Sequence, residues 1–148
     1  MGLFRGINAI NLDTKGRMAL PSRYRDRLDE SNLWVVTIDT ESPCLLLYPL
    51  HEWEIIEKKL ESLPSFNPAA RRIQRLLMGH ATDVELDANG RFVLPPVLRD
   101  YAQLEKQVML VGQGRKFEIW DAQQWSDGRT NWLAEETDLP AELQSLAL

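Results

Sequence analysis

The chain has 148 residues, of which 44% are apolar, and a formal net charge of −5, a composition typical of a globular protein. Its one cysteine, Cys44, excludes an internal disulfide and fits a reducing compartment. No apolar run approaches the roughly 18 residues that a membrane span needs, and the N-terminus lacks a signal-peptide pattern. We therefore expect a cytoplasmic protein that does not enter a membrane.

The charge is unevenly distributed along the chain. The segment from Asp121 onward has a net charge of −5, so residues 1–120 are neutral overall. Within them, residues 1–27 carry six basic and two acidic side chains, a local charge of +4. Such segregation fits an anionic partner for the N-terminal segment, and it equally fits an ordinary solvated surface.

The first predicted element is a β-hairpin with its tight turn at residues 13–16. Short apolar runs flank this turn at 9–12 and 18–20, and the turn offers an Asp at its start and a Gly where a positive φ is needed. Pro21 is expected in the first turn of a short helix over residues 22–28.

Two strands and two helices are predicted next. Apolar runs at 33–38 and 45–48 indicate the strands, and apolar side chains at helical spacing predict an amphipathic helix over 50–63. A second helix should begin at Asn67-Pro68, with Asn67 as its N-cap and a row of arginines on one side.

The N-terminal block then recurs. Residues 12–26 and 86–100 are identical at eight of fifteen aligned positions, in the pattern L-D-x-x-G-R-x-x-L-P-x-x-x-R-D. The second copy predicts another hairpin turn at 87–90, a short helix at 96–102 with Pro95 in its first turn, and strands at 108–111 and 117–120.

We therefore expect two tandem modules in one chain. The predicted boundaries are 7–54 for the first repeat, 55–80 for a helical connector, 81–124 for the second repeat and 125–148 for an acidic helical tail.

The sequence offers no convincing catalytic or metal-binding set. His51 and His80 occupy unrelated positions, and no nucleophile–histidine arrangement or phosphate-binding glycine loop is recognisable. One cysteine and two scattered histidines do not supply the four closely spaced ligands of structural zinc. We expect no enzymatic activity, no metal, no cofactor and no small-molecule substrate.

Each repeat places an arginine four residues after an aspartate, across the predicted turn. The aspartate can accept hydrogen bonds from loop N–H groups and pair with the arginine, as Asp13 with Arg17. Two interpretations remain open: a charged turn that only holds a hairpin, or a brace that orients an arginine toward phosphate or guanine in DNA. The residues expected to brace the loops are Asp13, Gly16, Asp87 and Gly90.

The repeated block resembles the AbrB-like (SpoVT/AbrB) DNA-binding domain. The tandem pair, with Leu3-Phe-Arg-Gly6 before it and Cys44-Leu-Leu-Leu-Tyr-Pro-Leu50 between the copies, is similar to the MraZ family of bacterial transcriptional regulators. The resemblance covers nearly the whole chain and is weakest in the tail. It implies an α+β fold in which two swapped-hairpin modules form one pseudo-symmetric β-barrel with flanking helices.

The resemblance also implies a function. Proteins of this family assemble as ring-shaped homo-oligomers on direct repeats in promoter DNA, where they act in the nucleoid as repressors of a cell-division and cell-wall gene cluster. Carried onto this sequence, the DNA contacts are Lys15 and Arg17, supported by Arg5, with Asn89 and Arg91 in the second repeat. Because Asn89 lacks the charge of Lys15, we expect the second loop to contribute less affinity.

Two further points are open. Arg25 and Arg99 recur at equivalent positions, each before an aspartate, and we favour a structural role for them over DNA contact. An alternative function is an AbrB-like antitoxin or protein-interaction module whose acidic tail wraps a partner, although the tandem copies and the short, tryptophan-bearing tail count against it. An enzyme on a related barrel lacks a nucleophile or metal set.

Overall fold

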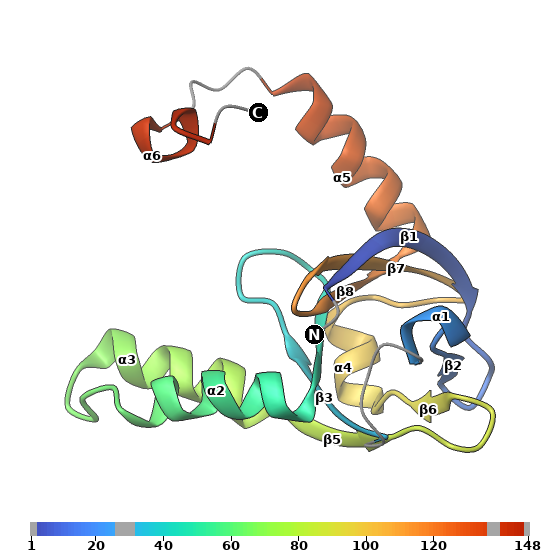
Figure 1. Ribbon diagram of the computed structural model, residues 1–148, viewed down its shortest axis with the longest axis horizontal. Coiled ribbons are helices and arrows are strands. Elements are labelled where there is room, and N and C mark those ends of the chain that lie inside the picture. The colour runs from blue at the N-terminus through green and yellow to red at the C-terminus, as the bar shows by residue number, and fades with distance from the viewer. Residues whose placement is uncertain (1–2, 26–31, 136–139, 147–148) are drawn as a thin grey trace.

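The computed structural model of the protein describes residues 3–25, 32–135 and 140–146 (Figure 1). Its strands are β1 (Phe4–Asn11), β2 (Arg17–Ala19), β3 (Leu33–Ile38), β4 (Leu45–Pro49), β5 (Thr82–Glu85), β6 (Arg91–Val93), β7 (Gln107–Gly114) and β8 (Phe117–Asp121). Its helices are α1 (Ser22–Arg25), α2 (Leu50–Glu61), α3 (Pro68–Ile73), α4 (Pro96–Tyr101), α5 (Ala122–Ala134) and α6 (Ala141–Gln144), with a π-helical turn η1 (Gln74–Met78) after α3. The predicted mixed α+β class is confirmed.

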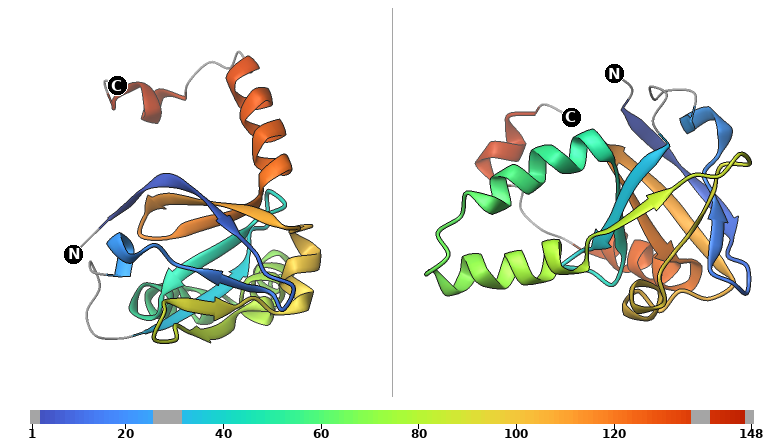
Figure 2. Two further views of the ribbon diagram at one scale, coloured as in Figure 1. Left: turned by 90° about the vertical axis from the view of Figure 1, so that its right-hand side faces the viewer. Right: turned by 90° about the horizontal axis from the view of Figure 1, so that it is seen from below.

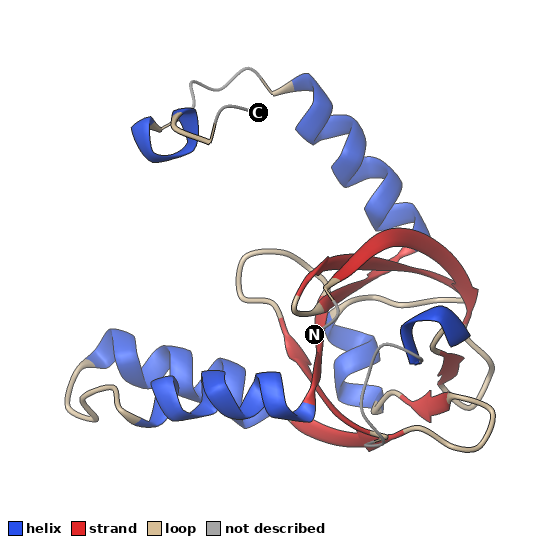
Figure 3. Cartoon of the chain, viewed as in Figure 1, coloured by secondary structure: helices blue, strands red, loops and turns tan. Residues whose placement is uncertain are grey.

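Six strands form one antiparallel sheet in the order β1-β7-β8-β4-β3-β5, and Figure 3 draws the strands in red. The pairs β3–β4 and β7–β8 join strands that are neighbours in the sequence, whereas β1 pairs with β7 and β5 pairs with β3, across the two repeats. Among the described residues the edge strands β1 and β5 do not pair with each other. The sheet is therefore open, and the predicted closed barrel is not confirmed.

The remaining two strands, β2 and β6, form a separate antiparallel ribbon that we call the β2–β6 ribbon. The predicted tight turns do form: the N–H of Gly16 donates to the carbonyl of Asp13 at 3.0 Å, and that of Gly90 to Asp87 at 2.9 Å. The predicted local hairpins are wrong, however, because β2 pairs with β6 rather than with β1, and β6 does not pair with β5. An apolar pattern of period two marks a strand but does not specify its partner.

One hydrophobic core joins the two repeats. At its centre Phe4 of β1 stacks on Phe117 of β8 with ring centroids 4.3 Å apart, and Tyr24 of α1 meets Phe117 edge-on at 4.8 Å. The ribbon and the short helices contribute buried side chains to the same cluster. This central cluster therefore depends on side chains from both repeats.

The other face of the sheet is covered by the longer helices. Trp53 and Leu60 of α2 pack on Val35 and Tyr48 of the sheet, while Trp120 of β8 packs against Trp125 of α5. In Figure 1, α2 and α3 extend as an arm on one side of the sheet, and α5 rises away from it at another. Strand β4 is buried along its whole length because it is covered on both faces.

The starts of α1, α3 and α4 lie within one residue of the expected signals. Asn67 caps α3, accepting from the N–H groups of Ala69 at 2.9 Å and Ala70 at 3.3 Å. Pro21 and Pro95 lie immediately before α1 and α4 rather than within their first turns. Residues 26–28 of the predicted first helix lie outside the described residues.

Within the described ranges, no helix combines the length and apolar character needed to cross a bilayer.

Candidate nucleic-acid interface

The β2–β6 ribbon places the two motif arginines on one outward face. Met18 pairs with Phe92 in the register, and both are buried, at 1% and 2% exposure. Because side chains alternate along a strand, the neighbouring positions Arg17 and Arg91 point to the opposite side. Arg17 lies opposite Val93 and Arg91 opposite Ala19, so the arginines are diagonal neighbours with Cα atoms about 7–8 Å apart.

We call residues 13–16, which precede Arg17, loop 1. The carboxylate of Asp13 holds this loop. Asp13 Oδ1 accepts from the N–H groups of Lys15 at 2.9 Å and Arg17 at 2.8 Å, and Oδ2 accepts from Arg17 Nε at 2.7 Å. The backbone and side-chain hydrogen bonds from Arg17 lower the pKa of Asp13 to about 2. Asp13 is therefore ionised at all physiological pH values.

The equivalent loop 2, residues 87–90, has the same backbone contacts and a longer side-chain contact. Asp87 Oδ1 accepts from the N–H groups of Asn89 at 2.8 Å and Arg91 at 2.9 Å, but Oδ2 lies 3.8 Å from Arg91 Nε. That Nε is buried and has no hydrogen-bond partner among the described residues. The backbone hydrogen bond from Arg91 is the main cause that lowers the pKa of Asp87, and the charge of Arg17 contributes, so the loops share one electrostatic neighbourhood.

Lys15 and Asn89 occupy the tips of their loops. Both are exposed, and neither side chain has a partner within the part of the chain that the structure describes. The two loops lie on the side of the molecule opposite the α2–α3 arm, and the right-hand view of Figure 2 shows them reaching out at separate points. The structure thus places four of the five expected DNA contacts on the β2–β6 ribbon and its two loops.

Arg5 is placed elsewhere. It lies near the start of β1, about 20 Å of extended strand from Asn11, the last residue of β1 before loop 1. Its carbonyl accepts a hydrogen bond from the hydroxyl of Tyr24 at 2.8 Å, and its side chain is exposed. Any contact between Arg5 and DNA would be made apart from the ribbon.

Each loop glycine meets an arginine from the opposite repeat. Gly16 and Gly90 have φ values of +81° and +75°, which disfavour other residues. A Cβ atom at Gly16 would lie 2.7 Å from Arg99 Cζ, and one at Gly90 would lie 2.5 Å from Arg25 Cζ. The sequence could not reveal these glycine–arginine contacts, because the two residues of each pair lie about one repeat apart along the chain.

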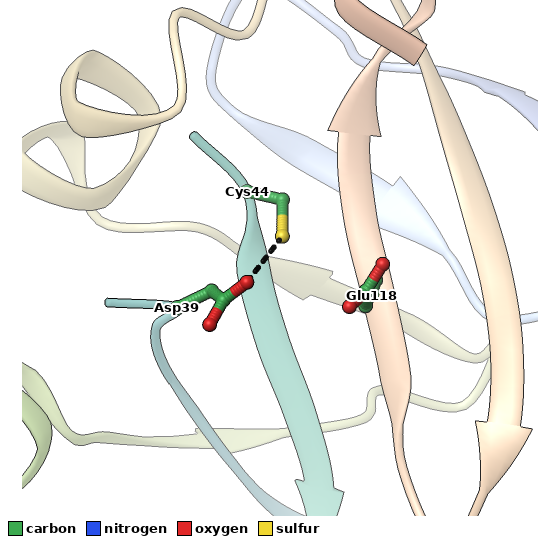
Figure 4. A group of neighbouring side chains, drawn as sticks. All are labelled: Asp39, Cys44 and Glu118. Carbon is green, nitrogen blue, oxygen red and sulfur yellow. Dashed lines mark hydrogen bonds between the residues drawn. The ribbon is translucent and has the colours of Figure 1, made fainter. Parts of the chain in front are cut away.

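A buried cysteine at the start of β4 lies beside two carboxylates, one just after β3 and one on β8 (Figure 4). Asp39, Cys44 and Glu118 come from β3, β4 and β8 or their ends, and their possible ligand atoms lie within 4.8 Å of one another. Burial raises the pKa of the Cys44 thiol, whose sulfur lies 3.6 Å from Asp39 Oδ2, and Glu118 accepts from Trp120 Nε1 at 2.8 Å. These contacts describe a hydrogen-bonded strand end.

Comparison with known proteins identifies the relatives of this chain. A family model described as "MraZ protein, putative antitoxin-like" matches residues 3–76 and again 77–142. The transcriptional regulator MraZ of Legionella pneumophila (strain Corby) is 60% identical over 152 residues, covering 99% of this chain and 100% of the relative. The proteins of the same name from Coxiella burnetii (strain RSA 493 / Nine Mile phase I) and Alkalilimnicola ehrlichii are 59% and 57% identical, with the same coverage. With both repeats matched and full-length relatives at this level of identity, the chain belongs to the MraZ family.

Proposed function

We propose that this protein is a sequence-specific DNA-binding regulator of transcription, and that the β2–β6 ribbon with its two loops is the DNA-contacting surface. The observation that carries the proposal is the hydrogen bonding of the Arg17 guanidinium. Its Nε is fixed by Asp13, while its two terminal nitrogens have no partner among the described residues. A guanidinium held in this way loses little conformational freedom when it binds.

The chemistry of the surface suits DNA. A two-stranded ribbon fits the major groove, where the terminal nitrogens of Arg17 can bind guanine O6 and N7 or a phosphate. Lys15 at the tip of loop 1 supplies a charge for the phosphate backbone, and Asn89 supplies an amide for adenine or phosphate. Membership of a family whose relatives are named transcriptional regulators supports the same assignment.

The two loops differ in ways that favour loop 1. Arg17 is bound by its aspartate at 2.7 Å, whereas Arg91 lies 3.8 Å from Asp87, and only loop 1 has a lysine at its tip. We propose that loop 1 provides most of the affinity of each protomer, and that loop 2 and Arg5 support it.

One protomer offers few phosphate contacts, which argues for assembly. We propose a ring-shaped homo-oligomer that engages several direct repeats at once, because linked sites can raise avidity by roughly 10²–10⁴-fold. By its family resemblance, the expected target is the promoter of the protein's own cell-division and cell-wall gene cluster, where binding in the nucleoid would repress transcription. No chemical reaction is assigned to the protein.

We also propose that the cross-repeat strand pairs make the two repeats swapped-hairpin modules of one pseudo-symmetric barrel, with the ribbon beside the open edges of the sheet. The boundaries 7–54, 55–80, 81–124 and 125–148 remain our proposed division of the chain.

The test is DNA binding by an Arg17→Ala variant. Fluorescence anisotropy is measured with a labelled duplex taken from upstream of the protein's own gene. Loss of one bidentate contact costs about 1–3 kcal/mol, and the loss is multiplied in a multivalent assembly, so binding should fall at least about tenfold. The wild-type affinity should also fall steeply as salt increases.

Arg129→Ala is the matched control, because it removes the same charge from the exposed face of α5, away from the ribbon. It should bind as the wild type does, and light scattering should give all three proteins the same mass. Wild-type affinity in a folded Arg17→Ala oligomer would contradict the proposal. Specific capture of a small basic protein, with no binding to the duplex, would instead favour the antitoxin alternative.

A further inference from the structure

We propose that Arg25 and Arg99 are positioning residues exchanged between the repeats, each of which holds the DNA-contacting loop of the other repeat in its bound shape. The inference rests on the proposed function, since it concerns the geometry of the two loops assigned to DNA. It gives the last arginine of the repeated motif a role distinct from that of the first.

Loop 1 shows the arrangement most completely. The guanidinium of Arg99, from α4 of the second repeat, lies over the position that a side chain at Gly16 would take, with both Cζ and Nε 2.7 Å from a Cβ placed there. Arg99 Nε also donates to the carbonyl of Leu94 at 2.9 Å, and the N–H of Leu94 donates to the carbonyl of Gly16 at 2.8 Å. Arg99, Leu94 and Gly16 thereby form one connected set of contacts.

Loop 2 mirrors these contacts. The guanidinium of Arg25, from α1 of the first repeat, covers Gly90, and the N–H of Leu20 donates to the carbonyl of Gly90 at 2.9 Å. Arg25 Nε is buried without a hydrogen-bond partner in the described ranges, so this side chain stacks on its glycine without the carbonyl contact that Arg99 makes. Loop 2 is therefore held less completely, as its longer Asp87–Arg91 distance also indicates.

The pairing explains why a glycine and a distant arginine recur together in the motif. A guanidinium is flat and can lie against backbone, whereas the ammonium of lysine is a compact, strongly hydrated charge on a flexible stem. Only a glycine leaves space for the flat group, and it also permits the positive φ of the turn. Substituting either arginine should therefore loosen the loop of the opposite repeat and leave the loop of its own repeat unchanged.

Hydrogen–deuterium exchange of the full-length protein, measured by mass spectrometry without DNA, tests whether each arginine holds the loop of the other repeat. Arg99→Lys should raise exchange in peptides covering residues 13–18 by about tenfold, comparable to the loss of one ordinary hydrogen bond, because the packing on Gly16 is lost, and leave residues 87–92 unchanged. Arg25→Lys should produce the reverse pattern, with a smaller increase. Arg129→Lys serves as the control, and unchanged protection of β7 and β8 verifies the fold.

Arg99→Gln provides a second variant should the lysine variant fold poorly. An increase in the loop of the same repeat, or in neither loop, would overturn the proposal.

DNA binding separates this inference from the function on which it rests. Arg99→Lys should weaken binding less than additively when combined with Arg17→Ala, and additively with Arg91→Ala, because Arg99 acts through loop 1 alone. If the exchange data show the crossed pattern while the wild type binds no DNA, the proposed function fails and the positioning role stands. If the wild type binds DNA and Arg99→Lys alters neither loop 1 nor affinity, the positioning role fails.

Discussion

Asp13 and Asp87 occupy equivalent positions, yet their distances to the arginine side chain four residues later differ. Both accept two backbone N–H groups, but only Asp13 binds Arg17 Nε closely, and its pKa falls to about 2. The local pattern D-x-x-G-R predicts the turn because every contact in it lies within four residues. It does not predict the difference between the loops, which depends on how each arginine packs against the rest of the chain.

The lowered pKa of Asp13 predicts a particular pH dependence of stability. A carboxyl group whose folded pKa lies below its ordinary value stabilises the folded state above that value of 3.8, and the contribution is lost as the pH falls toward about 2. Urea unfolding of wild type and Asp13→Asn should therefore show a constant difference in free energy from pH 5 to 7. The difference should shrink below about pH 4. A difference that grows on acidification would contradict this account of the brace.

Three glycines allow backbone strain to be separated from steric overlap. Gly16 combines positive φ with the guanidinium of Arg99, Gly114 has a φ of +81° with no atom within 4 Å of a Cβ, and Gly79 is helical and open. Gly114→Ala should cost about 1–2 kcal/mol for the left-handed backbone, and Gly16→Ala should cost more. Gly79→Ala should be neutral or stabilise by up to about 1 kcal/mol. Chemical denaturation of the three variants measures the order, and equal effects at residues 16 and 114 would remove Arg99 from the explanation.

At the scale of elements, the sequence predicts the central strands and the connector helices well. The runs at 33–38, 45–48, 108–111 and 117–120 all become strands, because short, mainly apolar stretches bounded by turns suit the strands of a buried sheet. The π-helical turn after α3 was not predicted. Nothing in the apolar pattern of that helix distinguishes it, and the carbonyl of Leu77 there is bound by the buried hydroxyl of Thr37 at 2.7 Å, a tertiary contact.

Helix α5 is attached to the sheet by aromatic contacts rather than by a broad apolar face. Trp120, Trp125 and Trp132 meet pairwise edge-on, with centroids 5.4 to 5.9 Å apart, and Gly128 leaves room for the ring of Trp132 one turn later. Past Trp132 the helix is exposed. The acidic tail of the sequence is therefore helical in its first part and docked by three indole rings.

Trp132→Ala should loosen the second half of α5. Two edge-on contacts are lost, each worth about 0.5–1.5 kcal/mol beyond area burial, although partial exposure of the ring reduces the total. Leu133→Ala is the control, because Leu133 is 82% exposed while Trp132 is 44% exposed. Limited proteolysis should cut the Trp132 variant faster within α5 and leave the Leu133 variant unchanged. Equal rates would show that the indole cluster does not hold the helix.

The whole molecule is more interwoven than its two sequence repeats suggest. Repetition in the sequence predicts two similar modules, but in the structure strands of one repeat pair with strands of the other. Strand β1 pairs with β7 of the second repeat, β5 pairs with β3 of the first, and β2 pairs with β6 across the two. The partner of each strand follows from the shared core around Phe117, which includes side chains from both copies. Because one repeat leaves its edge strands unpaired, neither half should be stable alone.

Cutting the connector should therefore leave the protein assembled. The loop between α2 and α3 is exposed, with Phe66 at 86%, and a sequence-specific protease site inserted after Ser65 would divide the chain between the repeats without breaking a strand pair. The two fragments should elute together from a sizing column, keep the circular dichroism of the uncut protein and bind DNA as before. They should separate in concentrated guanidinium, which verifies complete cleavage. Fragments that part in native buffer would mean that the cross-repeat strand pairs contribute little to the stability of the assembled protein. That result would also count against the proposed roles of Arg25 and Arg99, because each arginine reaches the loop of the other repeat only while the two repeats stay together.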